Sequence, residues 1–200
     1  MPFKNLWSYK NGLLIYGLIL IIINFILTQL PLVSTFGYEF AALNGLILTI
    51  LTGLHTLSFT SKSKYNLGKL IKNLLLLFLI PLIITLVNSA ITMFCSFMDG
   101  LIFYLLIVSV SMIFGSALSL VVSLVINRFR RVFFIIIIIL IILIPIVEIY
   151  FNPQVYFYSP LVGFFPGNIY DEGLSPDWKL LFHQIMVAIF SVSIIYIYSK

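Results

Sequence analysis

Residues 130–150 read RRVFFIIIIILIILIPIVEIY, and this stretch decides what kind of fold the chain adopts. Between Arg131 and Glu148 it has no charged side chain, and its apolar residues follow one another without the alternation of a half-buried strand. A helix needs about 20 mostly apolar residues to cross a bilayer. Only helices and closed barrels satisfy their backbone in lipid. The stretch therefore predicts a membrane-spanning helix.

Five more apolar runs have the same character, and together they set the fold class. The chain has 200 residues, of which 62% are hydrophobic and 8% are charged. A soluble domain usually carries about 25% charged residues, so lipid must surround most of this fold. We predict one all-α domain over residues 1–200, a polytopic membrane helix bundle. Its six transmembrane helices are expected at Gly12–Leu30, Glu39–Phe59, Leu70–Asn88, Leu101–Ile126, Val132–Tyr150 and Leu180–Tyr198.

The segments between the predicted spans divide the charges between two sides. All six acidic residues and Lys179 fall on one side, and ten of the eleven basic residues fall on the other. Because short cytoplasmic loops carry an excess of Lys and Arg, we predict cytoplasmic termini and a bacterial inner-membrane location. The net charge of +5 is then a topology signal, and no nucleic-acid partner is expected. The ten basic residues are Lys4, Lys10, Lys62, Lys64, Lys69, Lys72, Arg128, Arg130, Arg131 and Lys200.

Small and hydroxyl side chains recur along two of the predicted spans. Such residues let helix backbones approach closely, and their hydroxyls can hydrogen-bond across the contact. We interpret them as helix-packing surfaces at the centre of the bundle, with a polar pathway as the alternative. The residues are Ser111, Gly115, Ser116, Ser119 and Ser123 in the fourth span, and Gly45, Thr49 and Thr52 in the second.

Ionisable residues near the outer side form a candidate polar site. Glu39, Glu148 and His183 lie near the outer ends of their spans, and Asp171 and Glu172 lie in the loop before the last span. An ionisable group in a span is costly and suggests a function by default. These five side chains could gather as a cation or proton site. Alternatively, each reaches water or lipid headgroups separately.

Other polar residues within the spans are interpreted as structural. His55 lies about one turn from an inner helix end and is assigned to packing. Asn24, Asn44 and Asn88 are expected to make polar contacts between helices. Cys95 is the only cysteine, so neither an intramolecular disulfide nor a cysteine metal cluster can form. We predict no cofactor, no metal and no catalytic residue.

The loop before the last span, residues 151–178, reads FNPQVYFYSPLVGFFPGNIYDEGLSPDW. Its many aromatic residues are too apolar to remain loose in water, and its prolines and glycines exclude a single continuous helix. We predict a structured element that lies on the outer leaflet or dips back into the bundle, with a tight turn at Pro166-Gly167. It is either an aromatic belt that seals the bundle or a lid that contacts substrate.

The topology resembles the membrane domain of ABC-2-type permeases. The likeness rests on six spans with cytoplasmic termini, a basic second-to-third connection and the structured loop before the last span. It implies a homodimer partner or a separate ATPase subunit, and a re-entrant outer element within residues 151–178. Contacts with the ATPase would come from Lys62, Lys64, Lys69 and Lys72.

Two other functions are weighed against this permease-like role. Residues 152–172, NPQVYFYSPLVGFFPGNIYDE, resemble the membrane region that precedes gluzincin-type peptidase domains in some bacterial proteins. That resemblance implies a membrane anchor or scaffold. An intramembrane serine protease would need a nucleophile in a G-x-S-G context, whereas Ser116 lies in FGSALS and His183 lies near the outer boundary. The permease-like subunit is therefore preferred, the anchor is the alternative, and the protease ranks below both.

Overall fold

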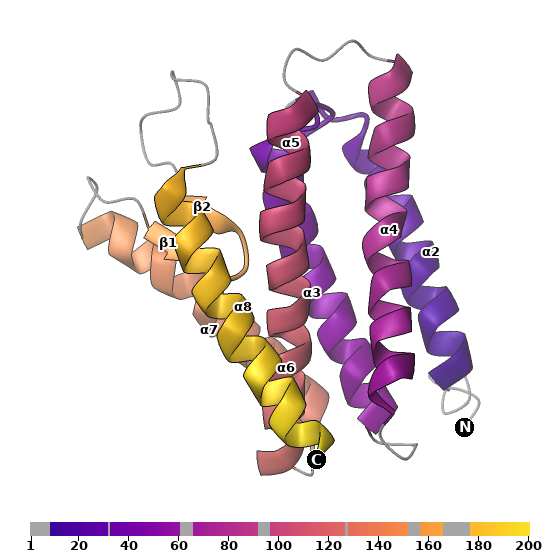
Figure 1. Cartoon of the computed structure of the whole chain (residues 1–200), viewed down its shortest axis with the longest axis vertical. Coiled ribbons are helices and arrows are strands. Elements are labelled where there is room, and N and C mark those ends of the chain that lie inside the picture. Colours follow the sequence, from indigo (N-terminus) through magenta and orange to yellow (C-terminus); the bar gives the residue numbers. More distant parts are fainter. Residues whose placement is uncertain are drawn as a thin grey trace.

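Helices occupy all six of the predicted apolar runs in the computed structural model, which describes residues 9–31, 33–60, 66–91, 97–126, 128–151, 157–165 and 177–200 (Figure 1). The helices are α2 Tyr9–Leu27, α3 Tyr38–Thr60, α4 Leu67–Ile91, α5 Phe97–Phe103, the π-helix η1 Tyr104–Val108, α6 Ser109–Val125, α7 Arg130–Phe151 and α8 Trp178–Ser199. Two short strands, β1 Phe157–Ser159 and β2 Gly163–Phe165, precede α8. The class prediction, an all-helical apolar bundle, is confirmed.

Five helical segments are long and apolar enough to cross a membrane: α3, α4, the continuous path from α5 to α6, α7 and α8. The apolar part of α2, Gly12–Leu27, is shorter than these. The predicted span ended at Leu30, but α2 stops at Leu27 and residues 28–30 form turns. Pro31 follows directly, and a proline disfavours helical geometry in the residue before it. The described chain thus contains five long candidate spans and one shorter apolar helix.

Two other helices differ from their predicted bounds for local reasons. Helix α4 starts at Leu67 instead of Leu70 because the side-chain Oδ1 of Asn66 accepts a hydrogen bond from the Lys69 backbone N–H at 3.1 Å. This is the usual role of an asparagine at a helix N-terminus. The predicted span at Leu101–Ile126 starts at Phe97 and contains the π-helical turn η1. Sequence periodicity did not indicate that turn.

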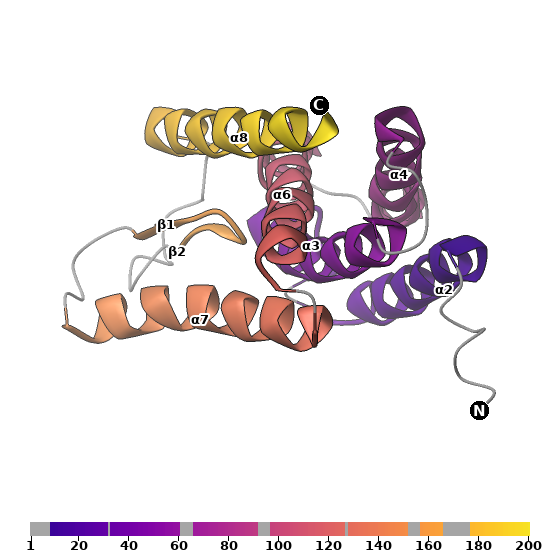
Figure 2. The ribbon, with the colours of Figure 1, turned by 90° about the horizontal axis from the view of Figure 1, so that it is seen from below.

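Helix α3 lies at the centre of the bundle and packs against α2, α4, α6 and α7. Seen from below, α6 is nearly end-on beside α3, whereas α7 and α8 are inclined to it and flank it on opposite sides (Figure 2). The β-hairpin lies between α7 and α8 (Figure 2). Much of α7 and α8 is exposed apolar surface, as expected where lipid is the solvent.

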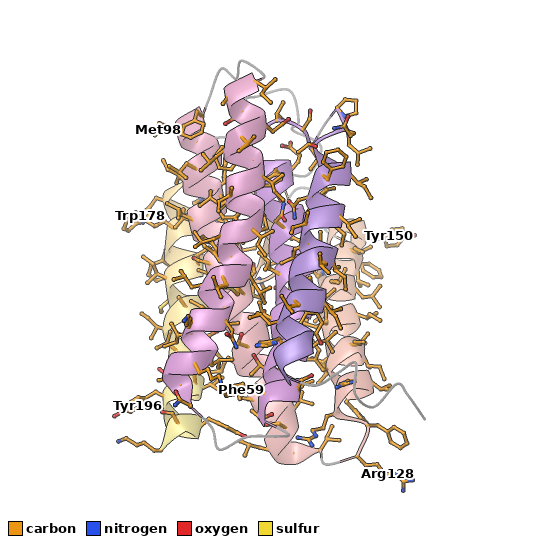
Figure 3. The ribbon with its side chains drawn as sticks, turned by 90° about the vertical axis from the view of Figure 1, so that its right-hand side faces the viewer. Phe59, Met98, Arg128, Tyr150, Trp178 and Tyr196 are labelled. Atoms are coloured by element: carbon orange, nitrogen blue, oxygen red, sulfur yellow. The ribbon has the colours of Figure 1, made fainter. Side chains whose placement is uncertain are left out.

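The charged residues separate along the long axis of the bundle. Basic side chains gather at the end where α4 and α7 begin and α8 finishes, and we call this the basic end. Arg128, Phe59 and Tyr196 mark it, whereas Met98, Trp178 and Tyr150 lie toward the opposite, acidic end (Figure 3). The acidic end carries the start of α3 with Glu39, the start of α5 with Asp99 and the start of α8 with Asp177 and Lys179. The described residues therefore keep the charge separation on which the predicted orientation depends.

Candidate functional site: a hairpin seated on the α3–α6 seam

Helices α3 and α6 meet along small residues of both helices, and we call this contact the α3–α6 seam. A Cβ atom added at Gly115 would lie 2.5 Å from the backbone oxygen of Thr49, which is closer than real Cβ contacts allow. The hydroxyl of Thr49 lies 2.7 Å from Gly45 O and 3.0 Å from Ser111 O. Glycine thus brings the two backbones near enough for a side chain of one helix to reach a carbonyl of the other.

The other hydroxyls of this region also bond to backbone carbonyls. Thr52 Oγ1 lies 2.6 Å from Leu48 O and 3.3 Å from Met112 O across the seam. Ser116 donates to Met112 O at 3.0 Å, and Ser119 donates to Ser116 O at 2.7 Å. Ser123 donates to Leu120 O at 2.7 Å. Thr49 and Thr52 thus bond across to α6, whereas Ser116, Ser119 and Ser123 bond to carbonyls of their own helix.

The β-hairpin dips into the bundle and rests on this seam. Strands β1 and β2 are antiparallel, with Ser159 opposite Gly163 at the tip. A Cβ at Gly45 would lie 2.7 Å from Leu161 O, so only glycine leaves room for the tip there. Gly45 is two turns into α3, which places the tip about 10 Å below the start of that helix. Residues 157–165 therefore pack within the helix bundle, whereas Pro166-Gly167 lies outside the described residues.

Side chains of the bundle satisfy the polar backbone of the hairpin. Ser111 Oγ lies 2.9 Å from Pro160 O and 3.0 Å from Leu161 O. Tyr38 donates its hydroxyl hydrogen bond to Phe164 O, and the two rings lie 4.6 Å apart. Non-helical backbone is tolerated at membrane depth only where protein or a water-filled cavity surrounds it. Ser111 and Tyr38 provide this protein environment.

The turn at the tip depends on local residues as well. The Leu161 N–H donates to Ser159 Oγ at 3.3 Å, and Gly163 has a φ of 84°. Glycine adopts this left-handed conformation without steric cost. Gly163 also faces the π-helix, since a Cβ there would lie 2.7 Å from Ile107 Cδ1. Single π-helical turns are frequent at functional sites, and this one borders the hairpin seat.

The predicted outer polar site is not formed by the described residues. Among them, no three His, Cys, Asp or Glu side chains come close enough to hold a metal ion. Glu148 is exposed on α7, which inclines away from the α3–α6 seam (Figure 2). The ring of His183 lies 5.6 Å from that of Tyr158 in the hairpin. Glu39, Glu148 and His183 therefore form no metal-holding group within the described part of the chain, while Asp171 and Glu172 lie outside it.

Two of the four lysines predicted to contact an ATPase lie within the described residues. Lys69 and Lys72 are exposed at the basic end, and Lys62 and Lys64 lie outside the described residues. Ser116 is buried and bonds to its own helix, whereas His183 packs on Tyr158. These separate contacts do not form a nucleophile and its base.

A buried polar cluster near the basic end was missed at the level of sequence. His55 is 1% exposed, and its Nε2 lies 3.1 Å from Asn73 Nδ2 on α4. The ring of Tyr16 on α2 meets the imidazole edge-on at 5.9 Å. Arg131 on α7 donates to Ser58 Oγ on α3, one turn from His55, at 3.3 Å. Interhelical hydrogen bonds of this kind tie membrane helices together, so the cluster links four helices.

Several other buried polar atoms have no hydrogen-bond partner among the described residues. They include Oδ1 of Asn24, Oδ1 of Asn44 and the hydroxyl of Thr85. Both asparagines donate from Nδ2 to a carbonyl of their own helix at 3.0 Å, not to another helix as expected. Asn88 donates to Ser34 O at 3.2 Å. In helix α8, both amide atoms of Gln184 and the hydroxyl of Ser191 are also buried without a hydrogen-bond partner among the described residues. Unsatisfied buried groups require an explanation, commonly water or a ligand.

Comparison of the chain with protein-family models, curated proteins and solved structures found no match. The class of protein therefore follows from the fold and the site alone. The long apolar helices indicate a multi-pass membrane protein. Its distinguishing feature is a β-hairpin held on the α3–α6 seam.

Proposed function

We propose that the chain is a bacterial inner-membrane protein that crosses the membrane six times and acts as a permease-like subunit of a transport complex. The basic end then faces the cytoplasm together with both termini, because Lys and Arg are retained on that side. Helix α2 forms the sixth crossing. Its apolar part is short for a span, and local thinning of the bilayer or flanking polar residues can accommodate such a helix.

The packing of the β-hairpin inside the helix bundle is the observation that supports the transport role. An anchor needs only helices, whose backbone groups are satisfied within each segment. Extended backbone inside a membrane exposes N–H and C=O groups, and leaving one unpaired costs several kcal/mol. This chain commits Ser111, Tyr38 and Gly45 to holding such an element inside the bundle. Re-entrant elements are used in channels and transporters to line or close a path.

The unpaired buried polar atoms support the same role. Lipid tails cannot hydrogen-bond with them, so an interior containing Asn24, Asn44, Thr85 and Gln184 favours entry of water or a polar solute. A helix bundle that served only as an anchor would gain stability from apolar residues at these four positions.

Co-purification tests the proposal. The tagged protein is extracted from its native membrane in mild detergent, the mass of the complex is measured and the bound chains are identified. We expect a complex that contains an ATPase subunit and more than one copy of this 22.8 kDa chain. A solitary chain with no bound protein would exclude this form of the permease role.

The partner contact has a matched control within the chain. Lys69 and Lys72 are exposed at the basic end, and Lys179 is exposed at the acidic end. We expect Lys69→Glu with Lys72→Glu to release the ATPase, and Lys179→Glu to retain it. Loss of the partner in both variants would indicate a general defect instead of a local contact.

A membrane anchor or scaffold is the second candidate, and one observation favours it. The hydroxyls of the α3–α6 seam bond to backbone carbonyls, so this seam offers no open polar path. An anchor predicts that charge reversal at Lys69 and Lys72 and disruption of the hairpin leave the biological activity of the native strain unchanged.

A further inference from the structure

The turn that joins α6 to α7 holds a strained backbone position. Among the described non-glycine residues, only Phe129 has a positive φ, at 62°. Bulky side chains rarely adopt this left-handed conformation, whereas Gly, Asn and Asp take it more readily. The carbonyl of Phe129 accepts hydrogen bonds from the N–H groups of Val132 and Phe133 at 3.0 and 3.1 Å. The first turn of α7 therefore depends on the backbone at this strained position.

The strained position carries an exposed aromatic ring. The Phe129 side chain is 64% exposed, so packing within the bundle does little to offset the strain. Strained backbone often marks a functional position. The guanidinium of Arg128 lies 5.3 Å from the centre of the Phe129 ring, and Arg128 projects away from the bundle at its basic end (Figure 3). The turn thus presents an aromatic ring and a cation together to the surroundings of the protein.

No described carboxylate balances the positive charge of this turn. Arg128 is exposed and Arg130 is partly exposed, whereas Arg131 donates to Ser58 of α3. Glu148 is 18 residues beyond Arg130 on the same helix, a distance of about 27 Å that exceeds the screening length in physiological salt. Arg128 and Arg130 can therefore bind an anion from outside the bundle. The carboxylates that the structure describes all lie toward the acidic end, at Glu39, Asp99, Glu148 and Asp177.

Apolar surface begins immediately beside the arginines. Leu124 and Val125 at the end of α6 are exposed, and so are Val132 and Phe133 at the start of α7. Lipid tails cover such surface in a membrane, which places the lipid phosphates at the level of the turn. Phenylalanine rings insert at the boundary between headgroups and acyl chains. The turn and its flanks therefore match both parts of a phospholipid, the charged headgroup and the apolar tails.

We propose that the α6–α7 turn, formed by Arg128, Phe129 and Arg130, binds the headgroup of an anionic phospholipid. The guanidinium groups bind the phosphate, because the planar donors of arginine match phosphate oxygens. The Phe129 ring inserts among the acyl chains and holds Arg128 at headgroup level. A zwitterionic headgroup binds less well because it brings a positive charge close to the arginines. The proposal does not use the transport role, since it needs only that the turn lies at a membrane surface.

Quenching by brominated lipid measures which lipid lies next to the turn. Trp7→Phe with Trp178→Phe removes both natural tryptophans, and Phe129→Trp then reports from the turn. The matched control replaces only Trp7 and keeps Trp178, which is exposed at the acidic end between Asp177 and Lys179. Each protein is reconstituted in phosphatidylcholine vesicles with increasing fractions of brominated phosphatidylglycerol. We expect phosphatidylglycerol to be preferred on the order of 20-fold at the turn, and not to be preferred at Trp178.

Charge variants separate a local site from a general surface potential. Arg128→Gln and Arg130→Gln should each lower the preference at the Phe129→Trp reporter about fivefold. Lys72→Gln removes the same charge from α4, which α3 separates from the start of α7 (Figure 2), and should leave the preference unchanged. An equal loss in Lys72→Gln would overturn the proposal, and so would the absence of any preference at the reporter. Competition by inorganic phosphate at constant ionic strength would overturn it as well, because the ligand would then be a soluble anion.

The aromatic ring can be tested without disturbing the turn. Phe129→Asn keeps a residue that accepts the left-handed conformation, so the thermal midpoint in detergent without added lipid should not fall. Phosphatidylglycerol added to the micelles should raise the midpoint of the unaltered protein, as a ligand of the folded state does. It should raise that of Phe129→Asn by clearly less, and equal shifts would contradict insertion of the ring. None of these measurements involves an ATPase, so this proposal and the proposed function can fail separately.

Discussion

The α3–α6 seam and the contact between α6 and α8 both contain small polar residues but differ in how these residues are paired. Gly45 and Gly115 allow α3 and α6 to meet backbone to backbone, and Thr49 and Thr52 then reach carbonyls across the contact. Helix α8 contains no glycine, and its buried Gln184 and Ser191 are unpaired by the described residues. Polar side chains reach carbonyls across the contact where glycine brings two backbones together, whereas the two buried polar side chains of α8 have no such partners among the described residues.

The largest expected effect comes from widening the α3–α6 seam. Gly115→Ala places a methyl group 2.5 Å from the Thr49 backbone oxygen, which cannot move aside as a side-chain tip can. We expect a loss of about 2–3 kcal/mol of stability through overpacking, measured as a lower thermal midpoint in detergent. Gly12→Ala is the control, because its methyl would meet Tyr16 Cε2 at an ordinary 3.7 Å. Equal tolerance of both changes would contradict close approach at this seam.

Removing the hydroxyl that supports the hairpin tip should have the next largest effect. Ser111→Ala leaves Pro160 O and Leu161 O without the donor they share, and an unsatisfied buried acceptor costs about 1–3 kcal/mol. Limited proteolysis within residues 152–176 should accelerate together with the loss of stability. Ser193→Ala removes an exposed hydroxyl that bonds only within α8 and should leave both measurements unchanged. Unaltered proteolysis in Ser111→Ala would show that the tip does not depend on this serine.

A smaller effect is expected from the second support of the hairpin. Tyr38→Phe removes the hydroxyl that donates to Phe164 O but keeps the ring that packs on Phe164. We expect a loss of about 1 kcal/mol, the usual net contribution of one hydrogen bond, in thermal unfolding. Tyr38→Leu should be clearly worse, because it also removes the aromatic contact. Identical values for the two variants would mean that the hydroxyl alone matters.

The smallest stability effect should occur at Gln184 of α8. Gln184→Leu deletes an amide that the described residues do not pair, so we expect a change of less than about 1 kcal/mol in either direction. Comparison with Ser111→Ala then contrasts a polar group that bonds to the hairpin with a buried one that has no partner among the described residues. Destabilisation of Gln184→Leu as large as that of Ser111→Ala would show that the Gln184 amide holds the bundle together.

The helices could be predicted because their apolar runs are long and uninterrupted. The run at Leu70–Asn88 became α4, Leu67–Ile91, and the end of α2 moved only because Pro31 follows closely. The charge pattern was equally informative, since the basic residues of α4 and α7 begin those helices at one end of the bundle. These signals are local in sequence and need no knowledge of tertiary packing.

The site could be predicted only in part, because its contacts join distant parts of the chain. Residues 151–178 were expected to be structured, but Ser111 and Pro160, which meet at the hairpin tip, are 49 residues apart. Glu148 was expected near Glu39, yet the inclination of α7 cannot be read from its apolar residues. The seven-residue spacing of Gln184, Ser191 and Tyr198 was visible in the sequence. The contact of Tyr198 with Ser123 of α6, by contrast, joins residues 75 apart and could not be read from that spacing.

The position of the hairpin seat along the chain has a consequence for biogenesis. Tyr38, Gly45 and Ser111 are all synthesised before residue 157 leaves the ribosome, and N-terminal elements generally fold first during translation. The surface that receives the hairpin can therefore be assembled while α7 and α8 are still being made. The extended backbone then docks on a prepared surface and spends little time unpaired in lipid.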